Sequence, residues 1–148
     1  MGHAGHVLLL RWSLGRKGHG NDRPLEELTA SEPAARRGWD NAPAPAELLN
    51  LGRLARLLEQ VRALLGKPII INSAYRSKRV NDAVGSKDTS QHRIGCAADI
   101  RVPGMTPDEV VRAIVAAKLP FDQVIKEFDS WTHISVPNTG LDKPRAQA

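Results

Sequence analysis

The sequence predicts an α+β domain, built from helices and a small, mostly antiparallel sheet. Three observations lead to this fold class. At 148 residues the chain has room for one hydrophobic core but not for two substantial ones. Stretches with helical periodicity alternate with short runs of β-branched residues. The last two of these runs are separated only by a tight polar turn, which is typical of an antiparallel hairpin.

The two ends of the chain differ in character from the middle. Residues 1–23 are rich in glycine, histidine and basic residues, and their apolar stretch Val7–Leu10 is shorter than the core of a usual signal peptide. We therefore expect a disordered leader over residues 1–23 and no clear signal peptide. Residues 24–137 form the predicted domain, and residues 138–148 an irregular tail. No apolar run approaches the roughly 20 residues that a membrane-spanning helix needs, so no transmembrane segment is expected.

The helices are predicted from apolar periodicity and from end signals. A short helix is expected within Leu25–Asn41, before a proline-rich connection. Leucines then recur every three or four residues, which predicts an amphipathic helix over Ala46–Leu65. Lys78–Val84 can form a helical turn. Thr106–Glu109 combines a capping threonine, a proline and an acidic residue, and therefore predicts the start of a helix that ends at Pro120.

Four strands are predicted between these helices. Ile69–Ile71 is a run of β-branched residues that fits a buried strand. Ala97–Val102 is a second candidate, which stops at a Pro-Gly pair. Gln123–Phe128 and Trp131–Val136 flank a tight turn at Asp129-Ser130 and form the expected hairpin.

The formal net charge of +5 is compatible with an anionic partner, either a nucleic acid or the anionic polymers of a cell envelope. Against a nucleic acid, the basic residues are scattered, and aromatic residues make up only 4% of the chain, with none placed among basic clusters. We therefore expect no nucleic-acid partner. A nucleic-acid binder would instead show an affinity that falls steeply with salt.

Three side chains suggest a metal site. His92 and His133 are the only histidines within the predicted domain, and each lies next to a loop or a strand end. Asp99 enters an apolar strand, where a carboxylate is costly unless it is paired or binds a metal. Two imidazoles and one carboxylate are a normal ligand set for catalytic zinc. The alternative is that the histidines are ordinary polar residues and that Asp99 is a cap, because a His-x6-Asp pair is no diagnostic motif.

Four ordered segments carry a resemblance to a known family: Ser73–Ser77 (SAYRS), Ser90–Asp99 (SQHRIGCAAD), Phe121–Glu127 (FDQVIKE) and Trp131–Ser135 (WTHIS). Together they resemble the zinc D-Ala-D-Ala carboxypeptidase family, which includes VanX dipeptidases and many phage endolysins. The resemblance covers about Leu25 to Val136. It implies a hedgehog- or DD-peptidase-like fold, with one Zn²⁺ held by His92, Asp99 and His133 where the sheet meets its loops.

The resemblance also implies a general base. Many relatives place an acidic residue three positions before the last ligand, but that position is Ser130 here. The candidates are Glu127 and Asp129. A three-residue connection over residues 129–131 would put Glu127 opposite His133 on the same face of the hairpin, whereas a two-residue connection would put a lysine there. Asp129 is more simply a turn residue, and Glu127 could also be only a solvated charge.

Two further residues have roles by the same resemblance. Arg76 would orient the substrate and stabilise the oxyanion that forms on the attacked carbonyl, because a guanidinium offers a cationic donor for that charge. Ser90 would contact the substrate, although it could instead cap a helix or turn. Trp131 could wall the cleft or fill the core.

Other hydrolase chemistries lack support in the sequence. The single cysteine, Cys96, excludes an internal disulfide framework and a multi-cysteine zinc cage. As a nucleophile it would need a base, and both histidines of the domain are assigned to the metal. The sequence contains no Gly-x-Ser-x-Gly elbow of serine hydrolases.

The leading hypothesis is a zinc metallopeptidase that hydrolyses peptide bonds of bacterial peptidoglycan stem peptides with a metal-activated water. It would act as a D,D-carboxypeptidase or as an endolysin-type endopeptidase. The alternative is a zinc-binding, non-catalytic module of the same fold, which the missing acid at Ser130 keeps open. We expect a monomer whose partner is the peptidoglycan peptide substrate.

Overall fold

The computed structural model describes residues 6–8 and 22–138, and it confirms the α+β fold class. Its helices are α1 (Asp22–Thr29), α2 (Glu32–Arg37), α3 (Pro45–Leu65), α4 (Lys78–Ala83), the 3₁₀ helix η1 (Gln91–Ile94) and α5 (Pro107–Ala116). Its strands are β1 (His6–Leu8), β2 (Ile69–Ser73), β3 (Ala97–Arg101), β4 (Gln123–Glu127) and β5 (Trp131–Ser135).

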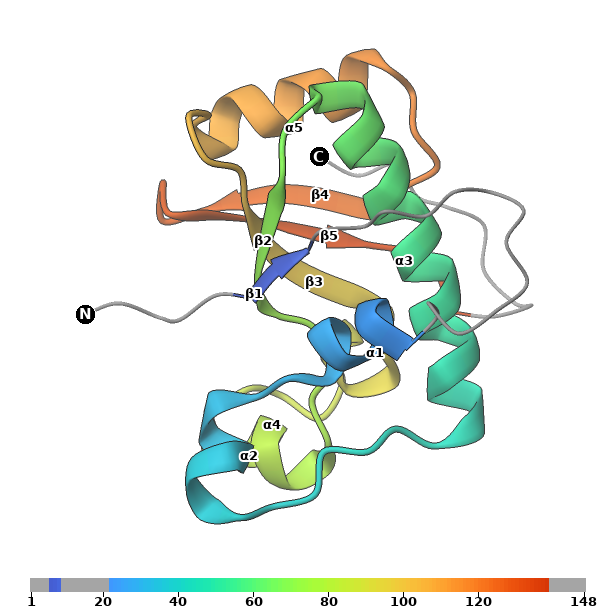
Figure 1. Cartoon of the computed structure of the whole chain (residues 1–148), viewed down its shortest axis with the longest axis vertical. Coiled ribbons are helices and arrows are strands. Elements are labelled where there is room, and N and C mark those ends of the chain that lie inside the picture. Colours follow the sequence, from blue (N-terminus) through green and yellow to red (C-terminus); the bar gives the residue numbers. More distant parts are fainter. Residues whose placement is uncertain (1–5, 9–21, 139–148) are drawn as a thin grey trace.

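The strands form one antiparallel sheet with the order β1-β2-β3-β5-β4. Long helix α3 runs beside this sheet along most of the molecule, and α5 lies at one end, with α2 and α4 at the other (Figure 1). The central pair is β3 and β5, in which Asp99 lies opposite His133. This register brings two of the proposed ligands together from segments that are far apart in the sequence.

One face of the sheet is the core face. Alternate residues of its strands are buried, and they share a hydrophobic cluster with the apolar side chains of α3 and α5. The largest fully buried members are Ile69, Ile100 and Ile134 from the strands, Leu51, Leu54, Leu58 and Val61 from α3, Val110 and Ile114 from α5, and Leu28 from α1. Because side chains alternate along a strand, Asp99 and His133 point to the opposite face. That face carries the candidate site.

Instead of the single short helix that we predicted within Leu25–Asn41, the structure has two helices, α1, which already begins at Asp22, and α2. The helical conformation is interrupted before α2. The Ser31 hydroxyl accepts a hydrogen bond from the Ala34 backbone N–H at 3.3 Å and so caps α2. Pro33 lies in the first turn of α2, a position that tolerates proline, whereas a continuous helix would place it in the interior. The predicted helix over Ala46–Leu65 corresponds to α3, and the capping box at Thr106 and Glu109 starts α5.

The hairpin register differs from both registers that we considered. The connection comprises residues 128–130, so Glu127 pairs with Trp131, and Ile125 is the residue opposite His133. Phe128 and Asp129 adopt left-handed conformations, with φ near 53° and 52°, and these close the turn without a glycine. The pairing therefore moves by two residues relative to the expected one. Since side chains alternate with a period of two, Glu127 stays on the face of His133 but lies diagonal to it.

Strand β1 was not predicted, and it lies within residues 1–23. It pairs with β2 at the edge of the sheet. The last two residues of the predicted leader, Asp22 and Arg23, lie in α1. Residues 1–5 and 9–21 fall outside the described residues, as do residues 139–148 of the predicted tail. Among the described helices, none is both long enough and apolar enough to span a bilayer.

Candidate metal centre

A cluster of three side chains lies on the face of the sheet opposite the core, which we call the open face: His92, Asp99 and His133. They come from η1, β3 and β5. One potential ligand atom from each residue lies within 4.8 Å of the other two. Within the described residues, this is the group of side chains that could hold a metal ion. The two imidazole rings meet edge to face, with their centroids 5.4 Å apart.

His92 is held in place on three sides. Its Nδ1 lies 2.7 Å from the Ala74 carbonyl oxygen, and since a carbonyl only accepts, Nδ1 is the donor of this hydrogen bond. The other nitrogen, Nε2, therefore faces the cluster, where it lies 3.3 Å from Asp99 Oδ1. The Ser90 hydroxyl caps η1 by accepting from the His92 backbone N–H. At the C-terminal end of η1, Gly95 has φ +81°. A Cβ at this position would come within 2.7 Å of the Glu47 carbonyl oxygen, so glycine lets η1 pack closely against α3.

Asp99 joins the two imidazoles. Its Oδ1 lies 3.3 Å from His92 Nε2 and 3.2 Å from His133 Nδ1. The side chains of His92, Asp99 and His133 are 4%, 17% and 13% exposed. Burial by itself would raise the pKa of Asp99, but hydrogen bonds with His133 and His92 outweigh it and hold the pKa well below its usual range. The carboxylate is therefore ionised at neutral pH, which metal binding requires.

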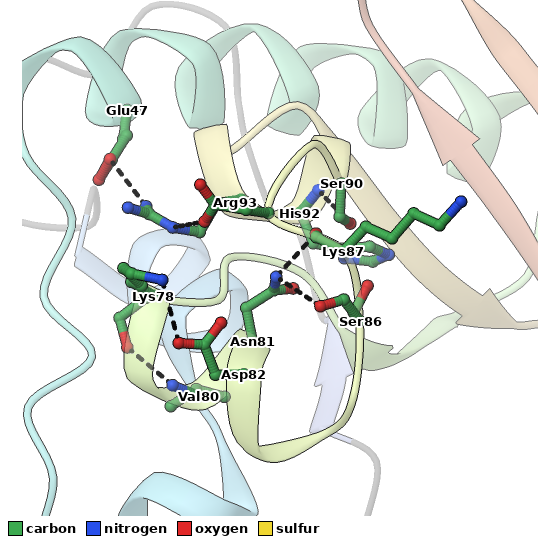
Figure 2. A network of polar contacts seen from close by, with 12 residues as sticks. Glu47, Lys78, Val80, Asn81, Asp82, Ser86, Lys87, Ser90, His92 and Arg93 are labelled. Carbon is green, nitrogen blue, oxygen red and sulfur yellow. Dashed lines mark hydrogen bonds and ion pairs between the residues drawn. The ribbon is translucent and has the colours of Figure 1, made fainter.

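The loop before η1 is fastened to α4 by Asn81, which is fully buried. Its side-chain amide donates to the carbonyl oxygens of Ser86 at 3.4 Å and Lys87 at 2.9 Å, as Figure 2 shows. Beyond the loop, the Arg93 guanidinium lies between Glu47 and Asp88. Our sequence analysis did not identify Asn81, because a buried amide that binds main-chain carbonyls leaves no local pattern. The same is true of the Ala74 carbonyl that orients His92.

Arg76 lies next to the cluster. Its backbone N–H donates to the His92 carbonyl oxygen at 3.0 Å, which ties the end of the β2 segment to η1. The side chain is half-buried, and its Nε is buried without a hydrogen-bond partner among the described residues. Burial lowers the pKa of Arg76, and the negative charge of Asp99 acts against that shift. A guanidinium with an unsatisfied N–H beside the cluster can donate to a ligand.

Glu127 and Trp131 close the same face at the hairpin end. They are directly opposite each other, and both are half-buried. No hydrogen bond or ion pair of the Glu127 carboxylate occurs within the described ranges. Trp131 Nε1 is buried without a partner there, and the Trp131 ring packs against Phe128, which is 82% exposed. Trp131 thus forms a wall of the open face rather than part of the core.

Asp129 points away from the cluster. Its side chain is 84% exposed and forms an ion pair with Lys126 at 3.3 Å, and Lys126 alternates with Glu127 on the opposite face of β4. Asp129 and Ser130 also line a pocket of about 410 Å³ that reaches Val110 of α5 on the core side. Of the two candidate bases, Glu127 is the one on the face of His133.

Cys96 has no role in this site and is expected to be unreactive. It is fully buried, and burial raises the pKa of its thiol to about 11. Since only the thiolate reacts, folded protein should resist iodoacetamide at pH 8, and labelling should rise as the pH approaches that pKa. Mass spectrometry reads the result directly, because the chain has one cysteine. Denatured protein at pH 8 is the positive control, and equally fast labelling of the folded protein would contradict the prediction.

The comparison with known proteins agrees with this arrangement. The chain matches the family described as Peptidase M15 over residues 23–135, which is well over half of its length and includes every side chain of the cluster. No curated protein shows a significant match to the sequence. The family match confirms the resemblance that the four motifs indicated: the chain belongs to the Peptidase M15 family, that of zinc D-Ala-D-Ala carboxypeptidases and VanX-like enzymes.

Proposed function

We propose that this protein is a zinc metallopeptidase that hydrolyses peptide bonds in the stem peptides of bacterial peptidoglycan. One observation carries the proposal. In a chain of a peptidase family, two imidazoles and an ionised carboxylate converge on the open face of the sheet.

The three side chains suit zinc in their ligand atoms, and His92 is already oriented for binding. Zinc accepts nitrogen and oxygen ligands, and three protein ligands leave a position open for water or substrate. His92 is already oriented by the Ala74 carbonyl, so that its free nitrogen faces Asp99. A bound zinc ion supplies Lewis acidity toward the peptide carbonyl and lowers the pKa of a bound water. His92, Asp99 and His133 are the ligands we propose.

The neighbouring side chains supply the rest of the chemistry. Glu127 accepts the proton of the attacking water and returns it to the leaving amine, as a general base and then a general acid. Arg76 directs its unsatisfied N–H to the carbonyl oxygen as negative charge develops there. Ser90 already caps η1 with its hydroxyl, and we propose that the same hydroxyl also contacts the bound peptide.

The test is a digestion of purified peptidoglycan with the zinc-loaded protein, with chelator-treated protein as the control. Mass spectrometry of the products identifies the new ends. Release of free D-alanine indicates a D,D-carboxypeptidase, whereas separated cross-linked peptides indicate an endopeptidase. We expect products in the zinc-loaded reaction, none after chelation, and recovery when zinc is restored.

The alternative, a zinc-binding module without catalytic activity, makes a different prediction in the same experiment. Protein that holds one zinc per chain but leaves every muropeptide intact would favour it. Protein that holds no zinc after careful preparation with zinc present would contradict both functions.

A further inference from the structure

A second cluster of functional side chains lies away from the proposed metal site. Arg37 is in the last turn of α2, Trp39 follows that helix, and Arg79 is in the first turn of α4. Both guanidinium groups lie over the ring of Trp39, with their Cζ atoms 4.8 Å and 5.0 Å from its centroid. Helices α2 and α4 lie side by side at the end of the molecule opposite α5 (Figure 1). We call these three residues the Arg-Trp-Arg cluster.

The two arginines of this cluster differ from the basic residues next to them, which form ion pairs with acidic side chains. Arg36, next to Arg37, forms an ion pair with Glu32, and Lys78, next to Arg79, forms one with Asp82. Arg37 and Arg79 are exposed, and neither has an acidic partner within the described residues. The structure therefore holds two unpaired cations against one indole ring.

This arrangement favours one kind of ligand. Each guanidinium group gains a modest attraction from the negative face of the indole, and its charge remains available to an anion. The stacking also restricts both guanidinium groups, which lowers the entropy that they lose when they bind an anion. Guanidinium groups bind phosphate oxygens through paired hydrogen bonds. Neighbouring phosphates of a chain-like anion can therefore engage both arginines together.

We propose that the Arg-Trp-Arg cluster is a docking site for a phosphodiester polymer of the bacterial cell envelope. A nucleic acid fits the cluster less well, because proteins that hold single strands stack bases on open aromatic faces. Here the half-buried ring of Trp39 is already covered by two guanidinium groups. Helix α4 also packs against η1, which carries His92. A polymer bound at the cluster would thus keep the open face of the sheet close to the wall.

The test is a binding titration with a defined glycerol-phosphate oligomer, followed by fluorescence anisotropy at low salt. Two double variants are compared with the unmodified protein. Arg37→Gln with Arg79→Gln removes the cluster, and Arg36→Gln with Lys78→Gln is the matched control on the same two helices. Both pairs remove two positive charges, but the control residues are the ones that already have acidic partners. Circular dichroism of each variant verifies that the helices are retained.

We expect the cluster variant to bind at least about tenfold more weakly, because two charge-assisted contacts are lost, and the control to change by less than about threefold. Equal weakening in both variants would show an effect of net charge alone and would overturn the proposal. Unchanged binding in the cluster variant would also overturn it. Tighter binding of a single-stranded DNA with the same number of phosphates would replace the envelope polymer with a nucleic acid. Since the readout is binding, the result is independent of the proposed hydrolysis.

Discussion

Asp99→Ala is expected to abolish both zinc binding and peptide hydrolysis. Asp99 provides the carboxylate oxygen that lies between the two imidazoles, and no other carboxylate joins this group in the described part of the chain. Without it, the group loses its one negatively charged ligand, and the affinity for a dication falls. Since a catalytic metal contributes several kcal/mol to transition-state stabilisation, hydrolysis should fall on the order of 10³-fold or more.

The measurements are the zinc content per chain after gel filtration and the rate of muropeptide hydrolysis. Asp82→Ala is the matched control, because Asp82 is an exposed carboxylate in an ion pair with Lys78 and contributes little to stability. It should retain zinc and activity. Full zinc content and full hydrolysis in Asp99→Ala protein would rule out the proposed ligand set.

Glu127→Gln is expected to stop hydrolysis while leaving the zinc in place. The amide keeps the size of the carboxylate but cannot accept the proton of the attacking water. General acid-base catalysis contributes about 10²–10⁴-fold, so kcat should fall by a factor in that range. The zinc content should not change, because Glu127 lies diagonal to His133 and is not part of the ligand group.

Asp129→Asn distinguishes the two candidate bases. Asp129 is exposed and paired with Lys126 on the opposite side of the hairpin, so its substitution should change kcat by less than about twofold. A large loss in Asp129→Asn protein together with an active Glu127→Gln protein would instead assign the base to Asp129. Loss of zinc in Glu127→Gln protein would show that Glu127 supports the metal site rather than the proton transfer.

Local signals predicted much of the fold. The periodic leucines of α3 and the capping box of α5 are properties of contiguous residues, so they can be recognised without knowledge of the rest of the chain. The break between α1 and α2 is also encoded locally, because Ser31 caps α2 and Pro33 lies in its first turn. The 3₁₀ helix η1 has only four residues, which is too short for any periodicity to appear.

The hairpin shows where local signals end. Its existence was predictable from two strand-like runs and a polar turn. Its register was not, because Phe128 and Asp129 take left-handed conformations that their residue types do not announce. In the observed register, Ile125 lies opposite His133, whereas the predicted register places Glu127 there. The difference does not move Glu127 to the other face, since the shift is by two residues.

The sequence by itself determined the fold class, the family and the identity of the three candidate ligands, because motifs and apolar patterns depend on residue type and spacing. The tertiary structure alone decided how these side chains meet. Pairing of β3 with β5 places Asp99 against His133, and the Ala74 carbonyl selects the nitrogen that His92 presents. Likewise, Arg37 and Arg79 come to share one indole ring only because α2 packs beside α4. Distances between segments far apart in the sequence arise from packing the whole chain around one core, and local composition does not contain them.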